Sequence, residues 1–163
     1  MQALIFILWI SIFLAFFAYF GYPLTLTFLS LFRRKKVLRA PITPMVSLII
    51  TAYNEEKRIR EKLENTMKLD YPREKLQVII ASDGSTDKTR DIVREYADRG
   101  VVLFEVPDRK GKENAQAQAV KIASGEIVVF SDTATRLDPK GLQEIVSNFA
   151  DPQIGCVSSE DKM

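Results

Sequence analysis

Hydrophobic residues fill the first 32 positions almost without interruption, and the chain changes character after them. Residues 3–32 are apolar or aromatic, and the only exceptions are Ser, Thr, Gly and Pro. Residues 1–32 carry no Asp, Glu, Lys or Arg. Roughly twenty apolar residues are enough for a helix to cross the hydrocarbon core of a bilayer. The pattern predicts a transmembrane helix over residues 1–32, with Gly21 and Pro23 as candidate kink positions that would leave Tyr22–Phe32 as an interfacial piece.

Two other interpretations of this run fit less well. A secretory signal has a basic beginning and a shorter apolar stretch, and this run has neither feature. A soluble helix of this length would show a polar face.

A basic cluster, Arg33–Lys36, follows the apolar run directly. Basic residues that flank a span stay on the cytoplasmic side, so we expect a single-pass protein of the plasma or inner membrane with its N-terminus outside. A basic cluster can also contact nucleic acid, but its place beside a span and a net charge of +2 argue against a nucleic-acid partner. Residues 33–44, which include Pro41 and Pro44, are expected to be a juxtamembrane linker before a cytoplasmic domain over residues 45–163.

The remaining residues alternate between short buried strands and amphipathic helices. The apolar runs predict strands at 45–51, 77–81, 101–106 and 127–130. The stretches between and after them predict helices from 55 to 68, from Ser85 or Thr86 as N-cap to 98, from 113 to 123 with Gly125 as the stop, and from 139 to 149. This alternation is typical of an α/β fold with a largely parallel sheet and helices on both faces.

Composition removes several kinds of chemistry from consideration. The chain has no histidine, which excludes His-based nucleophilic dyads and most catalytic zinc sites. Its single cysteine, Cys156, forms no internal disulfide and fits a reducing compartment.

Candidate site residues lie where the predicted strands end, because ligands of parallel α/β sheets bind beyond the carboxyl ends of the strands. The polar segments there are 52–56, 82–87, 107–112 and 131–135, and Asp83 and Asp132 each follow a strand directly. Taken singly, these segments also fit helix starts, capped turns and a solvated basic loop. Their regular recurrence along one alternation favours a shared binding site.

Three stretches resemble the nucleotide-sugar half of family 2 glycosyltransferases: VSLIITAYNEE, VIIASDGSTDKT and GKENAQAQAVKIASGEIVVFSD. The resemblance covers about residues 44–157 and implies a GT-A, Rossmann-like fold. It also implies transfer of a sugar from a nucleotide diphosphate donor, a UDP-sugar, to a glycan or lipid acceptor.

Specific roles follow from the resemblance for six residues. Thr51, Tyr53 and Glu55 would line the nucleotide pocket. Asp83 would accept a hydrogen bond from the base, and Lys112 would lie by the base or the phosphates. Asp132 would be the first acid of the DxD motif and would bind the family's divalent cation, Mg²⁺ or Mn²⁺.

The sequence also departs from the family pattern. Ala134 stands where the second acid of DxD is expected, which weakens the cation site, and Ala117 stands where the family often has Asn. The family's general base lies well after the first acid, so we expect it beyond Met163 and the chain to be a partial form. Within the chain, Glu160 and Asp161 are the candidates for that base.

A second class of function also fits the sequence. The alternative from another class is a non-catalytic nucleotide-sugar-binding module that lacks the acceptor half. A dinucleotide-binding fold, a P-loop protein and a haloacid-type phosphatase each need a local motif that the chain does not contain.

Overall fold

The computed structural model describes residues 1–32 and 36–159. Two compact units make up the chain, Met1–Val37 and Leu38–Met163, and each is described by itself. Arg33–Lys35 of the predicted basic cluster and the candidate bases Glu160 and Asp161 lie outside the described residues.

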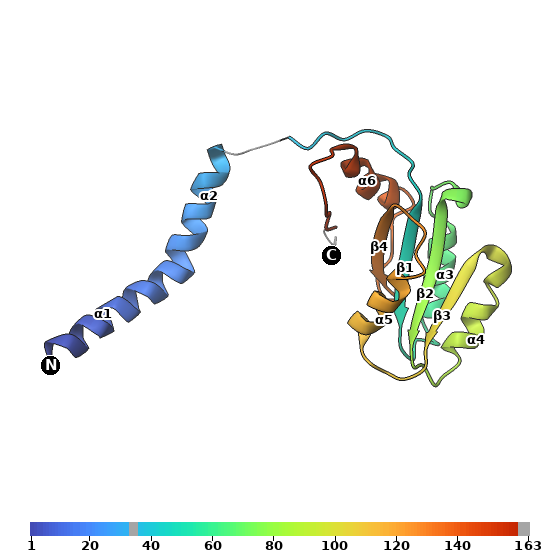
Figure 1. Cartoon of the computed structure of the whole chain (residues 1–163), viewed down its shortest axis with the longest axis horizontal. Coiled ribbons are helices and arrows are strands. Elements are labelled where there is room, and N and C mark those ends of the chain that lie inside the picture. The colour runs from blue at the N-terminus through green and yellow to red at the C-terminus, as the bar shows by residue number, and fades with distance from the viewer. Residues whose placement is uncertain (33–35, 160–163) are drawn as a thin grey trace. The chain divides into compact units, whose positions relative to one another are not determined.

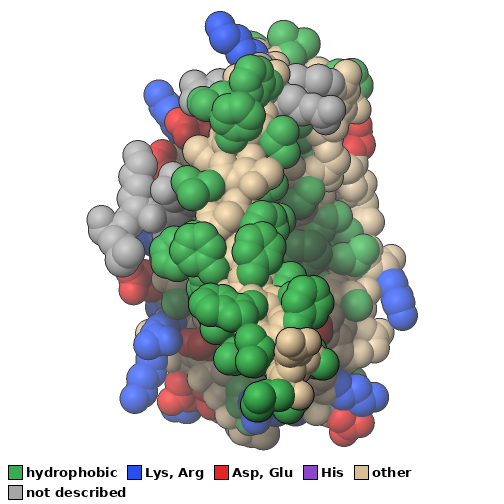
Figure 2. All heavy atoms as spheres, turned by 90° about the vertical axis from the view of Figure 1, so that its left-hand side faces the viewer, with side chains coloured by type: hydrophobic (Ala, Val, Ile, Leu, Met, Phe, Trp, Pro, Cys, Tyr) green, Lys and Arg blue, Asp and Glu red, His purple; other side chains and the backbone are tan. Residues whose placement is uncertain are grey.

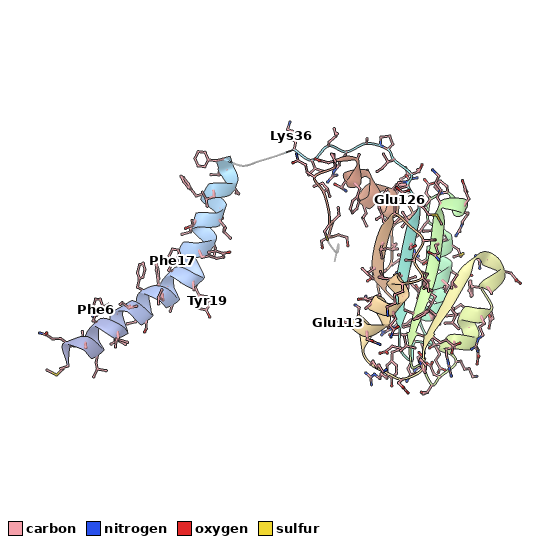
Figure 3. The ribbon with its side chains drawn as sticks, viewed as in Figure 1. Phe6, Phe17, Tyr19, Lys36, Glu113 and Glu126 are labelled. Carbon is pink, nitrogen blue, oxygen red and sulfur yellow. The ribbon has the colours of Figure 1, made fainter. Side chains whose placement is uncertain are left out.

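The first unit is a continuous apolar helix, Gln2–Phe32, long enough to cross a membrane. It consists of α1 (Gln2–Phe16), a π-helical turn (Phe17–Gly21) and α2 (Tyr22–Phe32). Hydrophobic side chains gather along it, and Phe6, Phe17 and Tyr19 project from it (Figures 2 and 3). The helix therefore continues through Gly21 and Pro23. The local effect of Pro23 is the π-helical turn Phe17–Gly21 just before it, because Pro23 has no backbone N–H to donate to the preceding turn.

The second unit is a four-stranded parallel sheet in the order β3-β2-β1-β4. The strands are β1 (Val46–Ala52), β2 (Leu76–Asp83), β3 (Val101–Val106) and β4 (Ile127–Asp132). The helices are α3 (Ile59–Met67), α4 (Thr89–Arg94), α5 (Lys112–Val120) and α6 (Gly141–Ser147), with short 3₁₀ turns at 73–75, 97–99 and 148–150. The predicted α/β class with a parallel sheet is confirmed.

Helices cover both faces of the sheet, as expected for right-handed crossovers (Figure 1). The steps from β1 to β2 and from β2 to β3 run in one direction, and their helices α3 and α4 share a core with α6 that includes Leu48, Ile50, Leu63 and Val93. The step from β3 to β4 runs back across β2 and β1, so α5 lies on the other face. There Ala115 and Ala119 pack against Ile49 and Ile79.

Several predicted helix ends were wrong in detail. The helix expected from residue 55 begins at Ile59, because residues 55–58 form a turn in which the N–H groups of Arg58 and Ile59 donate to Glu55 O. Neither Ser85 nor Thr86 is the N-cap of α4, because the helix begins at Thr89 with Lys88 as its N-cap. Asp87, just before the cap, accepts the Thr89 N–H through its carboxylate at 2.9 Å.

Gly125 has a different role from the predicted helix stop. It lies five residues beyond the end of α5, and its N–H donates to Ser47 Oγ on β1 at 2.9 Å. A Cβ at this position would collide with the backbone of Val46 and Ser47. Glycine is therefore required here by the close approach of two backbones.

Candidate functional site

The carboxyl ends of all four strands lie at one edge of the sheet, which collects the predicted site residues. In the sheet register Thr51 on β1 stands between Ala81 on β2 and Asp132 on β4. Asp83 lies two residues beyond Ala81. Asp83 and Asp132 thus flank the end of β1, with Cα atoms about 12 Å apart judged from the spacing of two strands and the rise of two residues.

Asp83 is held rigidly by the loop that follows β3. It is 3% exposed. Its two carboxylate oxygens accept the N–H groups of Lys110 and Gly111, each at 2.9 Å. The next residue, Gly84, has φ +66°, and a Cβ there would lie 2.8 Å from Arg109 N. Glycine at position 84 is what allows the loop to lie so close to the end of β2.

Asp132 has a more open environment than Asp83. Its carboxylate lies 2.6 Å from Lys112 Nζ at the start of α5, and the two side chains are 52% and 54% exposed. Exposed ion pairs contribute at most about 1 kcal/mol to stability. A ligand of suitable charge can therefore separate this pair at little cost.

Tyr53 follows the end of β1 and carries a cation over its ring. The guanidinium carbon of Arg109 lies 4.0 Å from the ring centroid. Four consecutive residues, 109–112, thus contact Tyr53, Asp83 and Asp132, which stand at the ends of three different strands. Figure 1 shows this β3–α5 connection crossing below the strand ends. Arg109 was not among the predicted site residues.

The loops that follow β1 and β2 are joined by hydrogen bonds that fix this edge. Asn54, in the left-handed region at φ 52°, accepts the Thr86 N–H through Oδ1 at 2.8 Å. Its own N–H donates to Ser85 Oγ at 3.2 Å. Burial acts to raise the pKa of Asp87, but hydrogen bonds from Thr89 and from the Glu56 N–H outweigh it and hold the pKa below its usual value.

Glu55 and Thr51 have distinct surroundings. The Glu55 carboxylate lies 3.9 Å from Arg58, while its backbone N–H donates to Thr89 Oγ1 at 2.8 Å. Thr51 Oγ1 is buried and, like Asn114 Nδ2, has no hydrogen-bond partner among the described residues. Buried polar atoms normally have partners, so these two are candidates for contact with a ligand.

A lysine that sequence reasoning missed lies beneath the end of β4. Lys62 on α3 is 3% exposed, and its Nζ donates to Ser131 Oγ at 2.7 Å and to Thr135 O at 2.6 Å. Burial lowers its pKa to about 8, against the opposing charge of Asp132. In the sequence, the only sign that Lys62 would be buried was its position next to Leu63, at the margin of the apolar stripe of α3.

The side chains at this edge do not fit a protein-built site for a divalent cation. Such cations prefer several carboxylate or carbonyl oxygens. Residues 1–32 and 36–159 contain no group of three or more Cys, Asp or Glu that could hold a metal ion. Asp132 is the one carboxylate of the DxD motif, because Ala134 stands at the second acidic position. Its carboxylate is also paired with Lys112.

Comparison with protein families identifies this arrangement. Residues 47–160 match the family model described as glycosyl transferase family 2. The chain belongs to glycosyltransferase family 2. The match covers more than half of the sequence and includes all four strands, except Val46 of β1, with their loops.

Curated relatives of this family 2 chain are named as sugar polymer synthases and sugar transferases. A poly-beta-1,6-N-acetyl-D-glucosamine synthase of Staphylococcus aureus is 30% identical over 120 residues, which is 72% of this chain and 29% of the relative. Validoxylamine A glucosyltransferase of Streptomyces hygroscopicus subsp. limoneus is 29% identical over 125 residues, or 72% of this chain and 28% of the relative. The chain thus spans less than a third of the length of these relatives.

Solved structures confirm the GT-A fold. The mannosyltransferase PcManGT from Pyrobaculum calidifontis, in complex with GDP-Man and Mn²⁺, matches with a TM-score of 0.76 and 35% identity. That match covers 88% of this chain and 45% of PcManGT. S. aureus TarS 1–349 in complex with UDP-GlcNAc matches with a TM-score of 0.59 and 30% identity over 62% of this chain and 30% of the TarS 1–349 chain.

Proposed function

We propose that this chain binds a nucleotide diphosphate sugar, a UDP-sugar, at the edge formed by β1, β2 and β4 and serves its transfer to a glycan or lipid acceptor. The observation that carries the proposal is the loop of residues 109–112. It joins an aromatic ring, a buried carboxylate and an exposed ion pair in one place. These features suit a planar base, the hydrogen-bond donors of that base and a diphosphate.

Four of the predicted residues have roles in holding the nucleotide in this proposal. Tyr53 with Arg109 offers a flat surface for the base, and Asp83 offers carboxylate lone pairs to the base edge. Thr51 Oγ1, which is buried without a partner among the described residues, lies in register with Asp132 and is available to the ligand. Glu55 contributes through its backbone, which holds the loops in place.

The reaction in this proposal is displacement at the anomeric carbon. The acceptor oxygen forms its bond to that carbon as the bond to the diphosphate breaks, and the hydroxyl proton passes to a base. Lys112 supplies positive charge where the leaving diphosphate becomes more negative. We assign no residue as the base.

The solved relatives support a nucleotide sugar but differ in its base. PcManGT was solved with GDP-Man and TarS with UDP-GlcNAc. The test of the donor must therefore include both uridine and guanosine nucleotides.

The apolar helix Gln2–Phe32 is proposed to anchor the domain in a membrane as a single span. The basic cluster at 33–36 supports a domain on the cytoplasmic side and an N-terminus outside.

A non-catalytic nucleotide-sugar-binding module is the second candidate. The two strand-end carboxylates favour it, because Asp83 is occupied by two backbone N–H groups and Asp132 by Lys112. Neither is poised to take a proton from an acceptor.

The decisive experiment uses the full chain in detergent. Calorimetry measures binding of UDP, GDP and ADP, and a parallel assay follows labelled sugar from UDP- and GDP-sugars into lipid and glycan acceptors. Binding of UDP with transfer supports the glycosyltransferase, and binding without transfer supports the second candidate. Preference for GDP would correct the donor, and binding of neither UDP nor GDP would contradict the proposal.

A further inference from the structure

Two lysines from different helices approach the end of β4 from opposite faces of the sheet. Neighbouring strand residues point to opposite faces. Asp132 meets Lys112 of α5, and Ser131 receives the Lys62 ammonium from α3 on the other side. Lys62 also donates to Thr135 O, so it holds both ends of the segment 131–135 that contains Ala134.

The charges around this segment have an unusual balance for a cation site. Lys62, Lys112, Arg58 and Arg136 bring four positive charges to this segment, against the carboxylates of Asp132 and Glu61. The opposing charge of Asp132 is felt by Lys62. Like charges repel strongly where one of them is buried, because water screens them poorly there. A divalent cation approaching Asp132 therefore meets a net positive surrounding, whereas a diphosphate anion is attracted to it.

We infer that the donor diphosphate is held at this segment by Lys112 in place of a divalent cation, with Lys62 as the residue that positions the segment from beneath. This inference rests on the proposed function, since it concerns the same nucleotide site. In the free protein Asp132 keeps the Lys112 ammonium at the edge. When the diphosphate arrives, it replaces the Asp132 carboxylate as the partner of Lys112.

In this arrangement Asp132 changes nucleotide affinity in the opposite direction from a metal ligand. A carboxylate that competes with the diphosphate for Lys112 weakens binding, so its removal strengthens binding. A carboxylate that ligates a cation strengthens binding, so its removal weakens it. The substitution Asp132→Asn keeps the shape of the side chain and separates the two cases.

The test measures UDP and GDP binding to the full chain in detergent by calorimetry, once in EDTA and once with Mg²⁺ or Mn²⁺. We expect binding in EDTA, with less than about a threefold gain on adding the cation, and a loss of about tenfold in Lys112→Gln. Asp132→Asn is expected to bind about two- to fivefold more tightly in EDTA. The matched control is Lys121→Gln, which removes the same charge from an exposed position just after α5.

The other outcomes contradict either the proposed diphosphate site at Lys112, called the lysine site here, or the proposed function. Binding that requires Mg²⁺ or Mn²⁺, or weaker binding by Asp132→Asn, overturns the lysine site while the proposed function stands. Wild-type affinity in Lys112→Gln also overturns the lysine site. Binding of neither UDP nor GDP in any condition contradicts the proposed function itself.

Discussion

Asp83 and Asp132 look alike in the sequence, since each ends a strand of the same parallel sheet, yet the fold gives them different environments. Asp83 is buried and accepts two backbone N–H groups. Asp132 is half-exposed and pairs with one exposed side chain, Lys112. The first is a fixed acceptor, which we propose recognises the base edge, and the second belongs to an exposed charge pair, which we propose the ligand opens.

The cause of the difference is the position of each strand in the sheet. β2 lies between β3 and β1, and the chain leaving β3 folds over its end. β4 lies at the outer position of the described sheet, where solvent reaches Asp132. Substitutions near Asp83 and near Asp132 test this difference, and the greatest losses of affinity and stability are expected near the buried Asp83.

The largest effect is expected for Asp83→Ala. The substitution removes a buried carboxylate that accepts two backbone N–H groups, which should lower the free energy of unfolding by about 1–3 kcal/mol. It also removes the contact proposed for the base, so we expect nucleotide affinity to fall by about tenfold or more. Calorimetry and thermal denaturation measure both effects. Asp91→Ala, an exposed position on α4, serves as the control, and unchanged affinity in Asp83→Ala would argue against the pocket.

Gly84→Ala tests whether the loop must lie close to Asp83. Both Gly84, at φ +66°, and Gly100, at φ +82°, have left-handed backbones, but only a Cβ at Gly84 meets the loop backbone. Gly100→Ala should therefore show only the conformational cost of about 1–2 kcal/mol and wild-type affinity. Gly84→Ala should lose more stability and several-fold in affinity. Equal behaviour of the two variants would mean that the loop does not organise the site.

Lys62 links the Asp132 side of the site to pH. Its pKa is lowered to about 8 by burial. The charge of Asp132 opposes this shift from the other face of the sheet. Arg58, Glu61 and Arg136 line the cavity of about 330 Å³ that Lys62 shares. As Lys62 loses its proton above pH 8, positive charge leaves the segment, so nucleotide affinity should fall by about threefold between pH 7 and pH 9.

The stability of the folded chain should change in the opposite direction. The folded-state pKa of Lys62 lies below its ordinary value of 10.5, so the unfolded chain binds more protons between pH 8 and that value. The melting temperature should therefore rise with pH across this window relative to Lys62→Met. A parallel decline of affinity and melting temperature would contradict the account, as would an unchanged pH profile in Lys62→Met.

The smallest effect is expected for Thr51→Val. The substitution replaces a buried hydroxyl that lacks a partner among the described residues with a methyl group of similar shape, so stability should stay equal or rise by at most about 1 kcal/mol. If Thr51 Oγ1 meets the ligand, affinity falls by about twofold. Calorimetry beside thermal denaturation checks both. A clear loss of stability would show that the hydroxyl has a partner within the folded chain.

The sequence predicted the fold because the signals for it are local. The uncharged run of residues 1–32 and the alternation of apolar strands with amphipathic helices are readable from neighbouring positions alone. Parallel pairing brings strand ends to one edge, which is why residue order alone was enough to group Thr51, Asp83 and Asp132. The ends of the helices were less predictable, since side chains such as Asp87 and Thr89 form turns that compete with the first helical turn.

Only the tertiary structure decided how the strand ends differ. The reach of residues 109–112 over three strands, the burial of Lys62 under β4 and the need for glycine at 125 all depend on contacts between residues far apart in the chain. The return of the chain from β3 across β2 and β1 creates these contacts. Residue order records that crossover only as a loop followed by a helix, so its consequences for charge and burial appear once the sheet has formed.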